Sequence, residues 1–466
     1  MMWYIAKREL YDNLNSLRFA LTTVLLLGLM LTNAVVHLRE HPARIQRHLS
    51  FVVEARNILE ARADSLYDLA RKGPGKLYKK PSPLHFCAEG RDTFLSGTVE
   101  TPYHFWDSNN LSSFWRMQYP AVPHNLTNIR PDVTKVDWGF IIGYALSLVA
   151  LLFTFDSICG ERERGTLRLM LANSIPRHTV LMGKFLGALI SVSIPFGIAV
   201  LMNLLLISTA RTLHLGAEAW GRLGIICFIA ILYTSLFLVL GLLVSARARQ
   251  SAVSLVILLL AWVTFVVFMP NILASIASGF SSPMSSDELQ VRRKQINNKL
   301  WEAYFHKTGV SKLRDMQVGS QFVIEDKAAQ ERLIEERLMQ QVEQVQQARA
   351  VTRISPAAIV QQLLESFAGT GFERHLQFLE NAQHYGRQYH VFIVDTDRGD
   401  PESLHLIGVP EGMSKKPVSP EAIPKFEDTL SLSKDFNAAA MDLLLLTLFV
   451  VVLLSGAYLA FVRVEV

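Results

Sequence analysis

The sequence is short of charged residues and of cysteine. Only 19% of its 466 residues are Asp, Glu, Lys or Arg, whereas about a quarter is usual in soluble domains. Half of the chain is hydrophobic, and these residues are gathered in blocks. Cys87, Cys159 and Cys227 lie in different environments, so no disulfide framework is expected. Basic residues are scattered, without the runs interleaved with aromatics that nucleic-acid binding favours. This composition predicts a polytopic membrane protein with no nucleic-acid partner.

The sequence also lacks the residues that hold nucleotides and metals. A phosphate-binding loop ends in Gly-Lys followed by Ser or Thr, and "GPGKLYKK" and "MGKFLG" have neither its spacing nor its hydroxyl. His37, His41 and His48 are close in sequence, but we expect Pro42 to interrupt the helix there. No acidic or Cys ligand completes a metal site. We therefore expect no catalytic residues, no metal and no cofactor bound by this chain.

Six apolar blocks are long enough to cross a bilayer, which takes about 20 residues in a helix. The first block is longer than a typical signal-peptide core and has no clear cleavage site, so we expect it to be retained. The predicted fold class is mainly α, with six transmembrane helices. The blocks are 19–36, 138–155, 185–210, 223–246, 252–270 and 438–462.

Basic residues in the short connecting segments predict the orientation, because such segments lie in the cytoplasm. They occur in four places that six spans bring to one side of the membrane. Both termini are therefore expected in the cytoplasm, although Arg211 and Arg222 in the short outer loop are mildly against this rule. The residues are Lys7, Arg8 and Arg18; Arg162, Arg164, Arg168, Arg177 and Lys184; Arg247 and Arg249; and Arg463.

Two large segments remain outside the membrane, 37–137 and 271–437. In the first, apolar residues at mostly three-, four- and seven-residue steps predict a stalk helix that ends at Gly73, followed by a small mixed region of loop and short strands. In the second we expect a small helical bundle or paired long helices, including two helices split at Gly369, the first capped by Ser355. Its charged stripe could be a partner-binding coiled coil, but it is more typical of a solvated face.

Charge is nearly absent within the spans, whereas ion transporters usually show buried acids or bases on their pathway. Asp442 is the one candidate, and we expect it at the outer membrane interface. Asn33, Asn203 and Pro195 favour helix packing over a substrate path. Any translocated substrate is therefore expected to be lipid-like or bulky rather than a small ion.

A charged segment, 156–184, separates the second and third blocks. Gly165 can end a helix there, because glycine tolerates the left-handed cap. Thr166 can cap a short helix over 167–172, and Pro176 can begin another that runs into the third block. On spacing alone the segment could equally be a simple topological loop.

This segment, "ERERGTLRLMLANSIPRHTVLMGKFLGA", resembles the Glu-x-Glu-x-Gly-Thr-Leu region, followed by a basic residue and Gly-Lys, of type-2 ABC exporter permeases. The resemblance extends to the six-span plan and to "MMWYIAKRELYDNLNSLR", which is similar to an interfacial elbow helix (1–18). The large outer segments resemble the bacterial subgroup found in gliding-motility and nitrous-oxide-reductase maturation operons.

The resemblance implies a bacterial inner-membrane permease with no catalysis of its own. Two copies of a separate ABC ATPase would bind ATP and magnesium, and a second copy of the chain or a sibling permease would complete the transporter in the surrounding lipids. The residues implied to couple the ATPase to the spans are Glu161, Glu163, Gly165, Thr166, Leu167 and Arg168, and those implied for the elbow helix are Trp3, Lys7, Arg8, Leu10 and Leu14.

Three functions follow as hypotheses. The chain could export a lipid-like or bulky substrate, or it could pass ATP-driven motion to a periplasmic partner without transport. It could also be a membrane-anchored scaffold or adhesion protein, but a scaffold needs no segment such as 156–184. The sequence does not decide between the first two.

Overall fold

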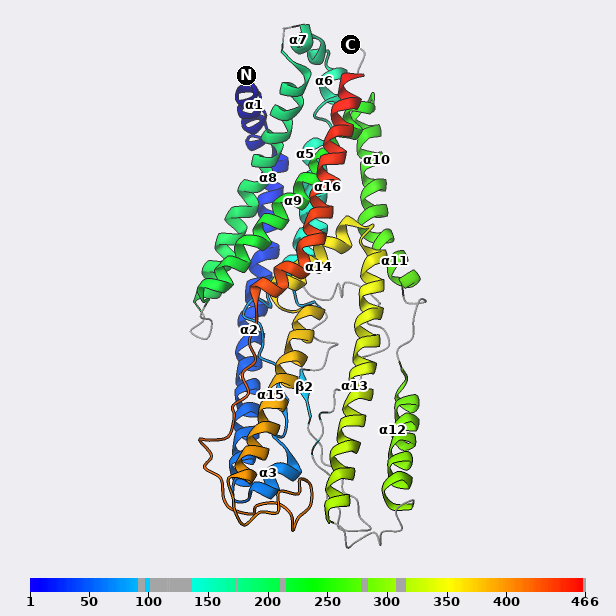
Figure 1. Ribbon diagram of the computed structural model, residues 1–466. Coiled ribbons are helices and arrows are strands. Elements are labelled where there is room, and N and C mark those ends of the chain that lie inside the picture. Colours follow the sequence, from blue (N-terminus) through cyan, green and yellow to red (C-terminus); the bar gives the residue numbers. More distant parts are fainter. Residues whose placement is uncertain are drawn as a thin grey trace.

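In the computed structural model the chain is elongated and almost entirely helical (Figure 1). The structure describes residues 1–90, 97–100, 115, 117, 136–172, 175–209, 215–277, 284–306 and 316–463. The elements are α1 (Met2–Leu14), α2 (Leu17–Arg62), α3 (Leu66–Lys72), β1 (Leu77–Tyr78), β2 (Thr98–Val99), α4 (Trp138–Phe140), η1 (Ile141–Leu146), α5 (Ser147–Thr154), α6 (Cys159–Glu163), α7 (Thr166–Ala172), α8 (Arg177–Ser208), α9 (Ala217–Arg247), α10 (Ser251–Trp262), η2 (Val263–Phe268), α11 (Met269–Ala277), α12 (Ser286–Trp301), η3 (Glu302–His306), α13 (Met316–Thr352), α14 (Pro356–Ala368), α15 (Phe372–Arg398) and α16 (Leu432–Val462).

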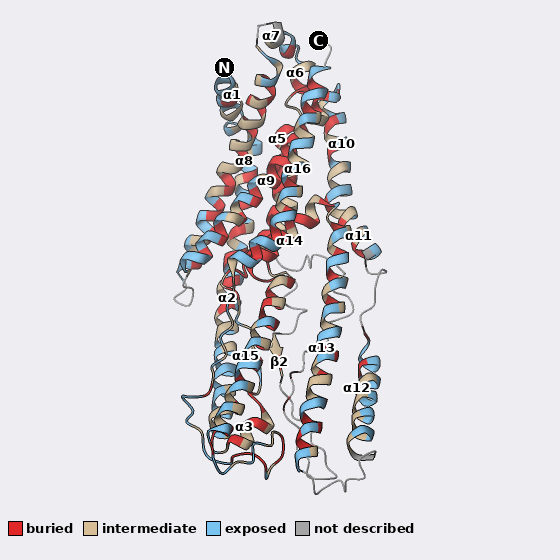
Figure 2. Cartoon of the chain, viewed as in Figure 1, coloured by how far each residue is buried: buried red, intermediate tan, exposed pale blue. Residues whose placement is uncertain are grey.

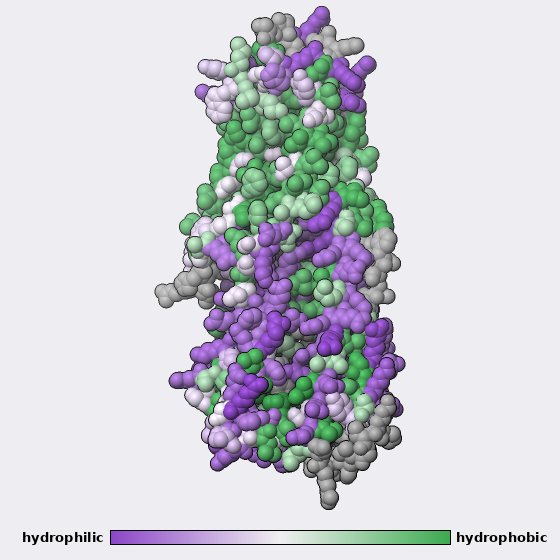
Figure 3. Space-filling model, in the orientation of Figure 1, coloured by the Kyte–Doolittle hydropathy of each residue, from purple (hydrophilic) through white to green (hydrophobic). Residues whose placement is uncertain are grey.

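Within the described residues, six helices or helical runs are long and apolar enough to cross a membrane. On the visible face of the molecule, hydrophobic side chains form a band, and hydrophilic side chains lie between this band and each end of the molecule (Figure 3). The prediction of a mainly α, polytopic membrane protein is confirmed. The six runs are Leu17–Arg62, Trp138–Glu163, Arg177–Ser208, Ala217–Arg247, Ser251–Ile276 and Leu432–Val462.

The molecule has two different ends. The beginning of α1 and the end of α16 lie near α6 and α7 at one end, which we call the α7 end (Figure 1). The other end holds the outer half of α2 with α3, β1, β2, α12, α13, α15 and the segment 399–430, which together we call the distal domain. Because α2 is continuous, it reaches from the α7 end deep into the distal domain.

The spans pack around α9, which contacts α5, α14 and α16. In the most apolar window of α9 61% of the residues are buried, but only 17% are buried in the corresponding windows of Ser251–Ile276 and of α16. These two runs therefore present apolar faces outward (Figure 2). Such faces need lipid or another subunit to cover them.

Two asparagines within the spans join helices rather than line a path. The amide of Asn203 donates to the carbonyl oxygen of Met30 at 2.7 Å and to Oδ1 of Asn33 at 3.0 Å. The amide of Asn33 in turn donates to the carbonyl oxygens of Phe86 and Val136, at 3.1 and 2.9 Å. Buried polar groups need such partners, and the prediction that these asparagines serve helix packing is confirmed.

Both outer segments contribute to the largest hydrophobic core of the distal domain. It brings Leu69 and Val99 from the first segment against Phe322, Tyr389 and Ile423 from the second. The only strand pairing in the described residues is short, with Leu77 opposite Val99 and Tyr78 opposite Thr98. The two segments are thus halves of one folded unit.

The expected interruption of the first helix at Pro42 is wrong, because Pro42 lies inside the continuous helix α2. A proline in a helix interior removes one hydrogen bond and costs about 3 kcal/mol, which the packing of the buried side chains around it, such as His37 and His41, can offset. The stalk also ends earlier than expected, at Arg62. A turn follows, and the short helix α3 ends at Gly73, where φ is 66°.

Helix α14 begins and ends as the sequence predicts. The hydroxyl of Ser355 accepts from the amide of Ala358, Pro356 is the first helical residue, and Gly369 has a left-handed conformation with φ of 67°. Its apolar face, which includes Ile359, belongs to the same core as the spans. This helix therefore attaches the distal domain to the membrane part.

Candidate functional site

The segment between the second and third spans forms two short helices at the α7 end (Figure 1). Helix α6 stops at Glu163, and Gly165 turns the chain with a positive φ of 74°, which glycine adopts without a steric penalty. Helix α7 begins at Thr166 itself, one residue earlier than expected. The hydroxyl of Thr166 donates to the carbonyl oxygen of Glu161 at 3.2 Å.

Lys184 is the centre of the site. Its side chain is 1% exposed, and Nζ pairs with Oε1 of Glu161 at 2.7 Å and with the carboxylate of Glu9. Removing an ammonium group from water is costly unless it is paired and hydrogen-bonded. The two carboxylates satisfy that need and join three elements, α1, α6 and α8, at one point.

Helices α1 and α8 approach closely because two glycines of α8 face α1. A Cβ atom at Gly183 would lie 2.8 Å from Cβ of Ile5, and one at Gly187 would lie 2.6 Å from Cβ of Glu9. Small residues one turn apart let helix backbones pack against each other. This contact holds Glu9 over Lys184.

Gly187→Ala should therefore destabilise the protein, whereas Gly197→Ala should not. Nothing lies within 4 Å of a Cβ built at Gly197, which is on the same helix. Overpacking costs about 1–3 kcal/mol, while Gly to Ala in an open helix position gains about 0.5–1 kcal/mol. Thermal unfolding of both variants in lipid nanodiscs measures the difference. Equal melting temperatures would show that α1 does not pack this closely on α8.

Two other side chains of α6 join the segment to the turn between α9 and α10. The carboxylate of Glu163 accepts from the amide of Ser251 at 3.0 Å and from its hydroxyl at 2.6 Å, which caps the N-terminus of α10. The guanidinium of Arg162 donates to the carbonyl oxygens of Ala246 and Ala248 at 3.3 and 3.1 Å. A displacement of α6 would therefore reach α8, α9 and α10 together.

Helix α7 divides into a buried and an exposed side. Leu167 is 1% exposed, and packs in a core with Val180 and Phe461. Thr166 and Arg168 are exposed, and so is Leu169, which is 71% exposed. We call Gly165, Thr166, Arg168 and Leu169 the outward face. Of the six coupling residues implied by the sequence, the structure thus places Glu161, Glu163 and Leu167 in internal contacts and the other three outside.

The elbow helix α1 also has two faces. Trp3, Lys7, Arg8 and Leu14 are exposed and Leu10 is half-buried. The face toward α8 carries residues that the sequence did not single out, namely Ile5, Ala6, Glu9 and Asn13. Glu9 was missed although it shares a helical face with the small residue Ala6.

At the opposite side of the spans, ion pairs join α9 to α16 and join α16 to the residue that follows α13. Arg222 of α9 pairs with Asp435 of α16 at 2.6 Å and with Glu218 at 3.0 Å. Asp442 is buried and pairs with Nε of Arg353, just after α13, at 2.5 Å. Arg222 is therefore a structural residue here. Through these pairs, a displacement of α16 would reach α9 and the end of α13.

A family model described as "ABC-2 family transporter protein" matches residues 3–466. The chain is similar to the "Probable ABC transporter permease protein NosY" of Pseudomonas aeruginosa, at 34% identity over 113 residues, 23% of this chain and 40% of the relative. The protein of the same name from Stutzerimonas stutzeri is 30% identical over 137 residues, 28% of this chain and 48% of the relative. The matches span less than half of each relative's length.

Proposed function

Because the chain belongs to the ABC-2 transporter family, we propose that it is a permease subunit whose α6 and α7 receive movement from a separate ABC ATPase. It has no catalytic role in this scheme: ATP and magnesium are bound by two ATPase copies. The α7 end faces the cytoplasm with both termini, in a bacterial inner membrane. A second copy of the chain or a sibling permease covers the poorly buried spans, and lipids cover the rest.

The observation that carries this proposal is the joint pairing of Lys184 with Glu9 and Glu161. A loop that only connects two spans needs no buried charge. Here a buried lysine makes the exposed segment, the elbow helix and the third span move as one body. The apolar residues exposed on α1, such as Trp3 and Leu14, favour a position at the membrane surface.

The substrate we propose is lipid-like or bulky, and export is the proposed direction. Buried charges at the ends of the spans are paired, as in Lys184 with its two carboxylates and Asp442 with Arg353. A small ion would need charged groups available along its path. The poorly buried faces of α10 and α16 are apolar, which suits contact with an amphiphile.

Arg168→Glu tests the outward face as the ATPase contact. A reversed charge within an interface places like charges together, which costs several kcal/mol, so we expect at least about tenfold less ATPase to co-purify. The control is Lys415→Glu, an exposed residue of the distal domain, for which co-purification should be unchanged. Equal co-purification of both variants would place the ATPase contact elsewhere.

A second candidate function is transmission of motion to a periplasmic partner. It is favoured by the continuity of α2 from Leu17 to Arg62, which links the α7 end to the distal domain through a single helix. The ion pair of Arg353 with Asp442 holds the end of α13 to α16, and the amide of Gln377 in α15 donates to Asp435, the partner of Arg222, at 2.6 Å. In this scheme the distal domain is the output of the ATPase cycle.

A further inference from the structure

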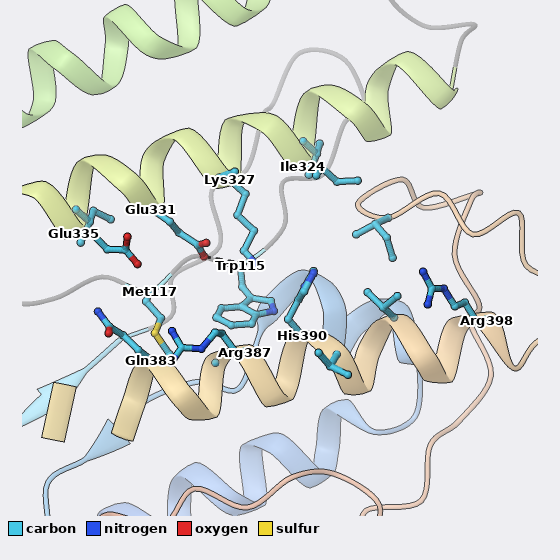
Figure 4. A pocket seen from close by; sticks show the side chains of 17 residues that line it. Trp115, Met117, Ile324, Lys327, Glu331, Glu335, Gln383, Arg387, His390 and Arg398 are labelled. Carbon is cyan, nitrogen blue, oxygen red and sulfur yellow. Dashed lines mark ion pairs between the residues drawn. The ribbon is translucent and has the colours of Figure 1, made fainter. Parts of the chain in front are cut away.

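The distal domain contains a cavity of about 620 Å³ between α13 and α15. Pockets for small ligands are typically about 300–1,000 Å³ and mostly apolar, with a few polar groups that fix orientation. This cavity fits that description, with Trp115 lying between the two helices (Figure 4). Its apolar lining includes Trp115, Met117, Val323, Ile334, Val391 and Ile407.

The charged residues of the lining are not equivalent. Lys327 lies 4.7 Å above the ring of Trp115 and 3.7 Å from Oε1 of Glu331, so its charge is already balanced. Within the part of the chain that the structure describes, Arg387 of α15 makes no ion pair or hydrogen bond. Figure 4 shows Arg387 at one end of the cavity, beside Gln383.

The other charged groups of the lining are mostly paired or neutral. Arg398 is 3.8 Å from Asp395 in an exposed pair, and Glu335 is the one acid besides Glu331. Burial lowers the pKa of His390 to about 4, so this imidazole is neutral near pH 7. With Lys327 paired to Glu331 and Arg398 paired to Asp395, Arg387 is the cation of the lining that has no partner among the described residues. A planar guanidinium is well suited to bind an oxyanion through two hydrogen bonds.

The position of the cavity decides where a ligand comes from. The stretch of α13 from Glu331 to its end at Thr352 has 1.5 Å of rise per residue, or roughly 30 Å in all. The C-terminal end of α13 is the one tied to a span, through Arg353 and Asp442. A lipid seated in the bilayer cannot extend that far, so an occupant must arrive from the aqueous side.

We propose that this cavity binds a water-borne amphiphile with one anionic group, whose apolar part lies on Trp115 and whose anion pairs with Arg387. The site is separate from the α7 end and does not depend on coupling to an ATPase. Its failure would leave the proposed permease function intact. Neither the apolar lining nor the guanidinium alone would select such a ligand.

The test uses the full chain in nanodiscs with a reporter cysteine, Val391→Cys, because Val391 lines the cavity and is 54% exposed. Octane-1-sulfonate should slow maleimide labelling of this cysteine in a saturable way, and neutral 1-octanol at equal concentration should protect it far less. The chain without the reporter gives the background labelling of the native cysteines.

Adding Arg387→Gln should weaken protection by octane-1-sulfonate roughly tenfold, since a charge-assisted contact is lost. Arg332→Gln is the matched control, because Arg332 is exposed on α13 outside the lining, and it should leave protection unchanged. Equal protection by both ligands, equal effects of both substitutions, or no protection at all would each overturn the proposal.

Discussion

Lys184→Met should uncouple the transporter and destabilise the protein by about 3 kcal/mol, the lower end of what breaking a buried ion pair costs. The reason is that Glu9 and Glu161, which are 22% and 27% exposed, would remain as two neighbouring carboxylates without a cation. Thermal unfolding in nanodiscs measures the first effect, and stimulation of the partner ATPase by the permease measures the second. Lys434→Met is the control, because its pair with Glu380 is about 60% exposed on both sides and such pairs contribute only about 0–1 kcal/mol.

A triple variant separates stability from coupling. Glu9→Gln and Glu161→Gln added to Lys184→Met remove all three charges, so most of the lost stability should return, as it often does when a whole buried ion pair is replaced by neutral groups. Coupling should stay lost, because nothing then ties α1 and α6 to α8. Full recovery of ATPase stimulation in the triple variant would show that the three residues only stabilise the fold.

The sequence could predict the helices of this chain better than their contacts. Apolar blocks and caps are local signals, and they identified the spans, the positive φ of Gly165 and the ends of α14. The contact between Glu9 and Lys184 joins residues 175 positions apart. On α1, Glu9 stands among the charged residues Lys7, Arg8 and Asp12, so no local pattern distinguishes it from a solvated charge.

A weaker signal for the site was present. One face of α1 carries residues at helical spacing that are, taken together, smaller or less charged than those of the opposite face of the helix: Ile5, Ala6, Glu9 and Asn13. On α8, Gly183 and Gly187 are one turn apart. Together they suggest two helices in close contact, but no local rule pairs one glycine stripe with one partner helix. For the same reason the sequence did not show that the two outer segments share one core.

Arg222→Met should destabilise the protein by about 3–5 kcal/mol, the cost of leaving a buried charge without its partner. Asp435 is 1% exposed, and after the substitution only Gln377, whose amide donates to it at 2.6 Å, would still bind its carboxylate. Thermal unfolding in nanodiscs checks this. Arg56→Met, which breaks an exposed pair with Glu60, should change stability by less than about 1 kcal/mol.

The double variant Arg222→Met, Asp435→Asn distinguishes the two functions. Without either charge, stability should return to within about 1 kcal/mol of the native protein, but the charged link between α9 and α16 is gone. If the distal domain is the output of the cycle, ATP-driven distance changes between spin labels on Met339→Cys and Leu404→Cys, both exposed, should become smaller in this variant, because α2 and the pair of Arg353 with Asp442 remain as links. If the chain exports a lipid-like substrate through its spans, ATP-dependent substrate movement should persist, because the contacts of Lys184 at the α7 end are unchanged.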